Sequence, residues 1–170
     1  MDIETMIKND MHNPYCIAWY DGINVSSFYL ANFKFSEKML IHALKKLLIK
    51  KYNNYKVYVH NLANFDAIFL LKILAKLGHC KPIIHNDKII SIQLNYGDYV
   101  IYFRDSQQLL LGSLRNLAKS FMVKIQKSIF PYIFVNENNL DYIGMVPDYK
   151  FFDDLTVNEY NEYCKQFNNN

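Results

Sequence analysis

The sequence predicts a mixed α/β domain. Runs rich in Val, Ile, Tyr and Phe alternate with longer segments of helical periodicity, in the order hairpin, helix, strand, helix, strands, helix. The 170 residues are 51% hydrophobic and 16% aromatic, so the chain can bury a sizeable core and lacks the composition of a disordered protein. A net charge of +3 permits a nucleic-acid partner but does not by itself indicate one.

The first predicted elements are a hairpin and a helix. Residues 16–30 contain two β-rich runs around Asp21-Gly22, a dipeptide typical of tight hairpin turns. Residues 36–52 place apolar side chains at helical spacing and lysines at other positions. These lysines fit two interpretations, a solvated helix face or a contact with phosphate groups.

A short strand and a buried helix follow. Residues 56–62 are predicted to form the strand, and residues 64–78 a helix with Asn64 at its N-cap and Gly78 at its end. Apolar side chains surround most of this helix, so we expect it to lie in the core.

The rest of the chain is predicted to contain two more strands, a helix and a long tail. The strands and the helix are predicted over residues 88–96, 99–106 and 113–122. From residue 128 onward periodicity is weak, and Thr156 with Glu159 forms a capping-box pattern before a short helix. We therefore expect a single domain over residues 1–170, with its core in 1–127 and an irregular loop and terminal helix in 128–170.

The sequence shows no pattern of a disulfide framework, a signal peptide or a membrane span. Its three cysteines, Cys16, Cys80 and Cys164, are far apart in the sequence. This spacing favours a reducing compartment. An acidic residue follows Met1 directly, unlike the start of a secretory signal. The most apolar run is interrupted by Lys72 and Lys76. We expect a soluble protein without a membrane partner.

Two acidic residues near the start of the chain, Asp2 and Glu4, are two positions apart in "MDIET". In a strand both side chains point to one face, whereas Ile3 points to the opposite layer. Two-metal phosphodiester hydrolysis uses such carboxylates, because Mg²⁺ and Mn²⁺ prefer oxygen ligands. The pair by itself fits either a metal site or a solvated acidic surface.

A second polar cluster lies in "YVHNLANFDAIFLL". Tyr58 and His60 are predicted to share one strand face, Asn61 lies at the strand end, and Asp66 falls in the first turn of the next helix. The helix dipole favours a carboxylate there, so simple capping is one account of Asp66. Functional groups are also commonly placed where a strand end leads into a helix, and the pattern leaves both accounts open.

Three ordered blocks carry a resemblance to a known family: "DIET", "YVHNLANFD" and "YFRDSQQLLLGSLRNLAKSF". Together they resemble the 3′–5′ exonuclease domain of family B DNA polymerases, in particular the protein-primed branch of bacteriophages and mitochondrial linear plasmids. The resemblance covers nearly the whole chain and includes "FPYIFVNENNLDYIGMVPDY". It implies a ribonuclease-H-like (DnaQ-type) fold with a mixed sheet and flanking helices, incomplete at both ends. It also implies a location in the mitochondrion, or in the host cytoplasm if the source is viral.

The resemblance implies roles for individual residues by position. Asp2, Glu4 and Asp66 match metal ligands for Mg²⁺ or Mn²⁺, and Lys127 matches a catalytic lysine, although a solvated lysine is an equal account. Other matched positions imply contacts with single-stranded DNA at the primer 3′ end: Thr5, Tyr58, His60, Asn61, Phe65, Phe69, Ser113 and Leu114. Ser113 and Leu114 also match a contact with the terminal (priming) protein, and equally fit an N-cap serine and a core leucine.

The match is incomplete, because the third exonuclease motif, a Tyr-x-x-x-Asp pattern, has no clear copy after Tyr160 or Tyr163. The polymerase motifs and the apolar residues expected before Asp2 are also absent, and the family would place the strand of Asp2 at the centre of the sheet. We therefore expect a fragment. Three functions remain open: the exonuclease part of a replicase, a non-catalytic module that binds single-stranded DNA or terminal protein, and an inactive gene remnant.

Overall fold

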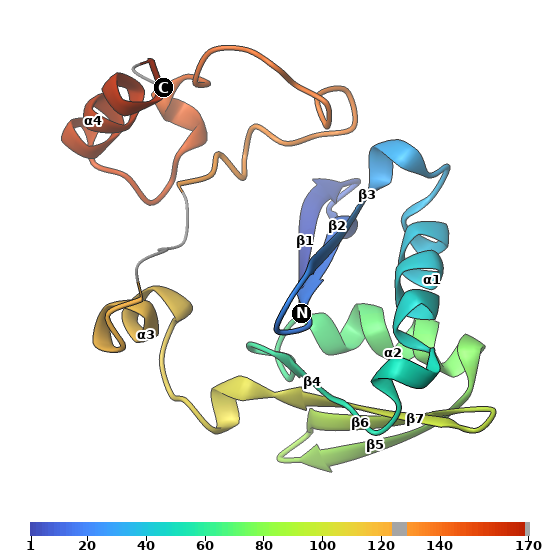
Figure 1. The fold of residues 1–170 in the computed structure, drawn as a ribbon. Coiled ribbons are helices and arrows are strands. Elements are labelled where there is room, and N and C mark those ends of the chain that lie inside the picture. Colours follow the sequence, from blue (N-terminus) through green and yellow to red (C-terminus); the bar gives the residue numbers. More distant parts are fainter. Residues whose placement is uncertain (124–128, 169–170) are drawn as a thin grey trace.

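Two β-sheets form the framework of the computed structural model, which describes residues 1–123 and 129–168 (Figure 1). The first sheet is antiparallel, with the order β1 (Asp2–Lys8), β2 (Met11–Tyr20) and β3 (Val25–Tyr29). The second has the order β4 (Lys56–Val59), β7 (Tyr99–Asp105), β6 (Lys88–Tyr96) and β5 (His79–His85). β4 runs parallel to β7, and the other pairs of this sheet are antiparallel, so the sheet is mixed as predicted.

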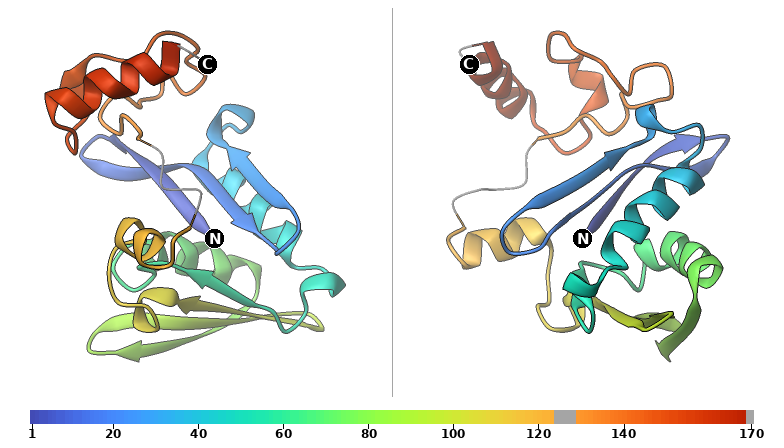
Figure 2. Two further views of the ribbon diagram at one scale, coloured as in Figure 1. Left: turned by 60° about the vertical axis from the view of Figure 1, so that its left-hand side comes forward. Right: turned by 45° about the vertical axis from the view of Figure 1, so that its right-hand side comes forward.

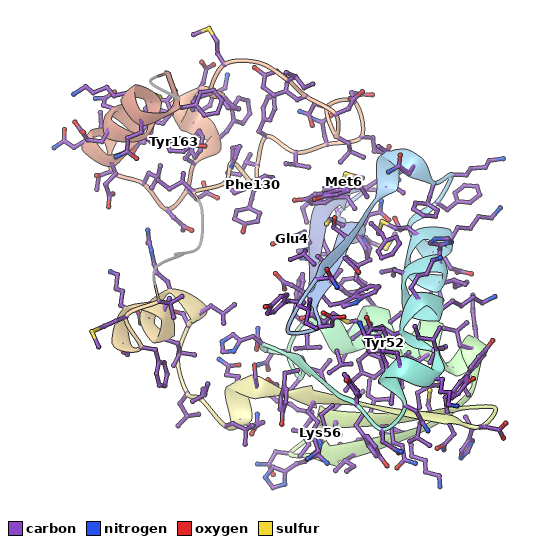
Figure 3. The ribbon with its side chains drawn as sticks, viewed as in Figure 1. Glu4, Met6, Tyr52, Lys56, Phe130 and Tyr163 are labelled. Carbon is purple, nitrogen blue, oxygen red and sulfur yellow. The ribbon has the colours of Figure 1, made fainter. Side chains whose placement is uncertain are left out.

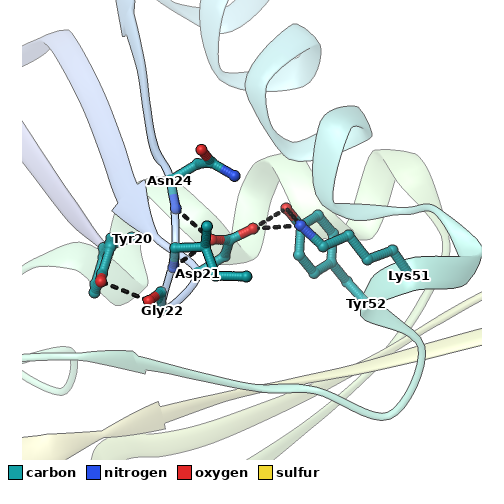
Figure 4. Close-up of polar contacts among 7 residues, drawn as sticks. Tyr20, Asp21, Gly22, Asn24, Lys51 and Tyr52 are labelled. Atoms are coloured by element: carbon teal, nitrogen blue, oxygen red, sulfur yellow. Dashed lines mark hydrogen bonds and ion pairs between the residues drawn. The ribbon is translucent and has the colours of Figure 1, made fainter.

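The predicted hairpin over residues 16–30 is present, and its turn is tied to the chain beyond the first helix. The Asp21 carboxylate accepts hydrogen bonds from the backbone N–H groups of Asn24 and Ile23, and from Lys51 Nζ and Tyr52 Oη on its other oxygen (Figure 4). These donors, the Asn24 amide first, hold the pKa of the Asp21 carboxyl well below its ordinary value. The turn therefore fixes the position of the hairpin relative to the end of the helix.

Two further hairpins were not predicted, and they share one turn chemistry. Asn9-Asp10 joins β1 to β2, and Asn86-Asp87 joins β5 to β6. All four residues have positive φ angles between 48° and 59°, the conformation that two-residue hairpin turns require and that Asn and Asp tolerate best after glycine. These turns extend β2 back to Met11, beyond the start of the predicted hairpin, and create β5, which was not predicted.

Two helices cover the sheets and share one core with them. α1 (Ser36–Leu47) packs on β2 and β3, while α2 (Asp66–Leu77) packs on α1, β5 and β6. Their buried apolar side chains join those of both sheets in one cluster, which includes Ile17, Leu44 and Phe103. The N-cap of α2 is Phe65, so the prediction of Asn64 was wrong by one residue; the Asn64 side chain instead donates to Asn61 Oδ1.

The position of β1 differs from the family expectation. β1 was expected at the centre of the sheet, but within residues 1–123 and 129–168 it pairs only with β2. Its other edge approaches β4 at one point, where the Met1 nitrogen donates to the Tyr58 carbonyl oxygen at 2.8 Å. The tight Asn9-Asp10 turn directs β1 along β2, and the first sheet diverges from β4 beyond Met1 (Figure 1).

The C-terminal tail is irregular up to a short terminal helix, as predicted. It follows α3 (Leu114–Ser120) and contains the 3₁₀ turn Tyr149–Phe151 and α4 (Val157–Asn168). The capping box is confirmed, because Thr156 N and Oγ1 donate to Glu159 Oε2 and Glu159 N donates to Thr156 Oγ1. The first sheet lies between the tail and α1 (Figure 2), and Lys8 pairs with Glu137 of the tail at 2.5 Å.

No helix in the described part of the chain is long and apolar enough to cross a membrane. All three cysteines are free thiols, and the sequence predicted no disulfide framework.

Candidate functional site

A cavity of about 620 Å³ lies where the starts of β1 and α2 meet α3 and the tail. We call it the acidic cavity. Eight of the predicted site residues line it: Asp2, Glu4, His60, Asn61, Phe65, Asp66, Ser113 and Leu114. Residues that are distant in sequence and belong to all three family-like blocks are therefore brought together in space.

β1 presents its two carboxylates as the strand periodicity predicts. Ile3 is buried, whereas Asp2 is exposed and Glu4 is half-buried on the other face. Figure 3 shows Glu4 on the side of β1 that faces Phe130 of the tail. The β1–β2 register shifts between Glu4 and Thr5, so that Thr5 lies opposite Pro14 and its hydroxyl bonds His12 Nδ1 at 2.9 Å.

Asp66 is the buried carboxylate of the cavity. The residue is 2% exposed, and its Oδ1 has no hydrogen-bond partner in the described part of the chain. Burial, together with repulsion from Asp2, raises the pKa of Asp66 to about 7, although backbone N–H groups of Ile3 and Asp66 itself oppose the rise. The backbone N–H of Asp66 itself is at the start of α2, so an interaction with the helix terminus and a functional role both remain compatible with this carboxylate.

The donor set of the cavity fits a hard divalent cation in its chemistry. Asp2, Glu4 and Asp66 offer carboxylate oxygens, and a cation beside Asp66 would satisfy a buried acceptor and relieve its repulsion with Asp2. The side chains are not assembled around a common point, since residues 1–123 and 129–168 contain no group of three His, Cys, Asp or Glu side chains placed to hold an ion together.

The loop between β4 and α2 carries Asn61 and His60. Asn61 has a φ of 67°, a left-handed conformation that asparagine tolerates better than most residues. The His60 Nε2 atom lies 3.0 Å from the Gly112 carbonyl oxygen and Nδ1 lies 3.2 Å from Ser106 Oγ. A carbonyl oxygen only accepts, so Nε2 carries a hydrogen and both ring nitrogens are engaged within the protein.

Tyr58 and His60 do not share a strand face, contrary to the prediction. β4 ends at Val59, and His60 already belongs to the turn. Tyr58 lines a separate cavity of about 230 Å³, together with Trp19 and Tyr52. Its aromatic ring is therefore not brought to the acidic cavity with the other predicted contacts.

Two further predicted DNA contacts, Thr5 and Phe69, also lie outside the lining of the acidic cavity. They support it indirectly, because Phe65 lines the cavity and packs edge-on against both Phe69 and His12, with ring centroids 5.5 and 5.4 Å apart. Thr5 in turn bonds His12. Phe65 is thus held by two neighbouring rings.

Ser113 and Leu114 line the cavity at the start of α3. Ser113 is the N-cap, as predicted, and its Oγ accepts from the Asn116 amide at 3.3 Å. Leu114 is 48% exposed, so the alternative of a core leucine is wrong. Lys127 lies outside the described residues.

Four polar residues that were not predicted also line the cavity: Gln107, Arg115, Asp153 and Asp154. The two aspartates stand between buried Phe152 and Leu155, which hold this stretch of the tail in place. Tyr149 precedes Asp153 by four positions, which is the spacing of the Tyr-x-x-x-Asp pattern sought further along the chain. The spacing of Tyr149 and Asp153 was therefore a signal in the sequence for this part of the site. It was missed because the tail around these residues has little regular periodicity.

Comparison with known proteins connects this arrangement to a family. A family model described as "DNA polymerase type B, organellar and viral" matches residues 47–170. The chain belongs to this family. Two fungal relatives, each named "Probable DNA polymerase", support the assignment: the protein of Neurospora intermedia is 36% identical over 92% of the chain, and that of Ascobolus immersus 38% over all of it. This type B chain spans 17% and 15% of their lengths.

A solved structure shares the fold of this type B polymerase chain. Phi29 DNA polymerase complexed with primer-template DNA matches 94% of the chain and 27% of its own length, with a TM-score of 0.58 and 17% sequence identity. At this identity the likeness concerns the fold alone. The predicted ribonuclease-H-like α/β fold is thereby confirmed, apart from β1, which lies outside the sheet of β4 to β7.

Proposed function

We propose that the chain is the 3′–5′ exonuclease region of a protein-primed, DNA-directed DNA polymerase that acts in DNA replication. The observation that carries this proposal is the convergence of the family-like blocks on one cavity, with Asp2 and Glu4 from β1 and Asp66 from α2. The polymerase family of the chain and the names of its fungal relatives support the wider assignment. A mitochondrial location of the polymerase is part of the same proposal.

Asp2, Glu4 and Asp66 would hold Mg²⁺ or Mn²⁺ in this proposal. When bound, the metal supplies an activated water and neutralises charge on the phosphate. The protein contributes the buried surroundings of Asp66, which together with the charge of Asp2 raise the pKa of this carboxyl. Asp153, which follows Tyr149 by four positions, offers a further carboxylate at the cavity wall.

The remaining lining residues suit an unpaired 3′ end of DNA. Phe65 offers an aromatic ring on which a base can stack without sequence preference. Arg115 is exposed and offers a positive charge to a phosphate in an otherwise acidic cavity. Lys127 is proposed to offset phosphate charge, and exposed Leu114 is proposed to contact either DNA or the terminal protein.

Cleavage of labelled DNA by the purified chain tests the proposal. With Mn²⁺ and 5′-labelled single strands, the native chain should shorten the DNA from its 3′ end, and Asp66→Asn should not. Asp141→Asn, which changes an exposed aspartate outside the cavity lining, serves as the matched control. Equal products from the native chain and Asp66→Asn would refute exonuclease activity for this chain.

A non-catalytic module that binds single-stranded DNA is the second candidate. It is favoured by the lack of an assembled three-ligand metal group among the described residues. In that case the native chain binds single strands equally well in EDTA and in Mn²⁺ without shortening them. A metal requirement for binding or cleavage would exclude it.

A further inference from the structure

The segments that follow two neighbouring strands, β4 and β7, contribute His60, Asn61 and Gln107 to the lining of the acidic cavity. The strands are parallel, and Val59 at the end of β4 lies opposite Asp105 at the end of β7. The chain therefore leaves both strands at the same edge of the sheet. From β4 it enters the loop with Asn61, and from β7 it enters the segment that leads to Ser113.

Asp105 links these two chain segments with its carboxylate. It is 3% exposed, and its oxygens accept hydrogen bonds from three backbone N–H groups, those of Asn61 at 3.1 Å, Ala63 at 3.0 Å and Gln107 at 2.8 Å. Two of the donors belong to the loop after β4. A buried carboxylate that receives several backbone donors makes directional bonds, so Asp105 supports the path of this loop.

The loop needs such support because its backbone is unusual. Asn61 occupies the left-handed region, and its carbonyl oxygen accepts from the amides of Asn64 and Phe65 to form a tight turn. The turn delivers Asp66 to the first position of α2. By accepting from the Asn61 amide itself, Asp105 favours this turn over more extended paths of the loop.

His60 makes a second connection between the same segments. Its Nε2–H donates to the carbonyl oxygen of Gly112, the residue before Ser113, and its Nδ1 is hydrogen-bonded to Ser106 Oγ. Asp105 and His60 therefore fix the two walls of the cavity relative to each other, one wall with Asn61 and Asp66 and the other with Ser113.

We propose that Asp105 is a positioning residue of the acidic cavity and that His60 assists it. Asp105 holds Asn61 and Asp66 in place through backbone amides, and His60 holds the Ser113 segment. This assignment rests on the proposed exonuclease function of the cavity. It gives His60 a role within the protein in addition to the direct DNA contact predicted from the sequence.

Asp105→Asn tests the proposal because it keeps the shape of the side chain. The amide has one acceptor oxygen, so its NH₂ group must face at least one of the three backbone donors. Ser91→Ala is the matched control: Ser91 is buried in the same sheet and loses one bond, to the Phe103 carbonyl oxygen, away from the cavity lining. Both variants are compared with the native chain by hydrogen exchange and by cleavage of single strands with Mn²⁺.

In Asp105→Asn we expect the amides of Asn61 and Ala63 to exchange at least about fivefold faster. We expect kcat to fall about tenfold to a hundredfold with little change in KM, because displaced ligands affect the reaction more than DNA binding. Ser91→Ala should show neither effect at a similar loss of melting temperature. Unchanged exchange, or a kcat no lower than that of Ser91→Ala, overturns the proposal.

Failure of the proposed exonuclease function and failure of the positioning role of Asp105 give different results in these experiments. A native chain that does not cleave DNA refutes the proposed function, and exchange at Asn61 and Ala63 then still decides whether Asp105 orders the loop. If Asp105→Asn does not fold, His60→Ala takes its place, because His60 is only half-buried. Faster exchange at Ser113 and a lower kcat then support the proposal, and native values for both refute it.

Discussion

Replacement of Asp66 by asparagine should stabilise the protein in a pH-dependent manner. Asp66 has an ordinary pKa of 3.8 and a pKa of about 7 in the folded chain, mainly because it is buried. The folded state therefore binds the proton more tightly than the unfolded state, so the stability that Asp66 contributes is complete below pH 3.8 and is lost as pH rises to about 7. At about 1.4 kcal/mol for each pH unit in this window, ionisation costs the folded state about 4 kcal/mol.

Urea denaturation of the native chain and Asp66→Asn at pH 4 and pH 8 measures this cost. At pH 4 the two free energies of unfolding should be similar, and at pH 8 the variant should be more stable by up to about 4 kcal/mol. Asp141→Asn, which changes an exposed aspartate, should follow the native chain at both pH values.

Addition of Mn²⁺ at pH 8 extends the test to the proposed metal site. A cation that binds Asp66 should recover part of the lost stability in the native chain and none of it in Asp66→Asn. The same difference in stability at pH 4 and pH 8 would refute the reasoning on Asp66, because a carboxylate whose pKa is unchanged on folding contributes no such dependence.

Three further substitutions address the fold and DNA binding. Gly78→Ala should destabilise the protein by about 1–3 kcal/mol in urea denaturation, because a Cβ there would lie 2.2 Å from the backbone oxygen of Asn95. Phe65→Ala should weaken binding of single-stranded DNA, measured by fluorescence anisotropy, by about 1–3 kcal/mol if a base stacks on its ring. Arg115→Ala should reduce the slope of log affinity against log salt by about 0.7, whereas Lys119→Ala, on the same helix but outside the cavity lining, should leave it unchanged.

Much of the candidate site was predictable because its residues lie in short local patterns. Asp2 and Glu4 share a strand face by periodicity alone, and Asp66 follows a strand end at the start of a helix. The burial of Asp66 was not predictable, because it depends on β1 packing against the start of α2. Asp153 was also missed, since the tail reaches the cavity through contacts far apart in the sequence.

The missed strand β5 has a comparable physical reason. It is an edge strand whose side chains are mostly exposed, and it contains Pro82, which lacks a backbone donor. Hydrophobic alternation therefore does not reveal it. Only pairing with β6 and the positive φ angles of Asn86 and Asp87 define it.

By itself the sequence determined the elements that depend on neighbouring residues: the apolar faces of α1 and α2, the Asp21-Gly22 turn and the capping box at Thr156. The tertiary structure alone decided how β1 is placed, that Tyr58 and His60 line different cavities, and that Asp66 is buried. Local patterns reflect backbone and side-chain preferences within a few residues. Burial, and with it the pKa of a carboxylate, is set by segments that meet only when the chain folds.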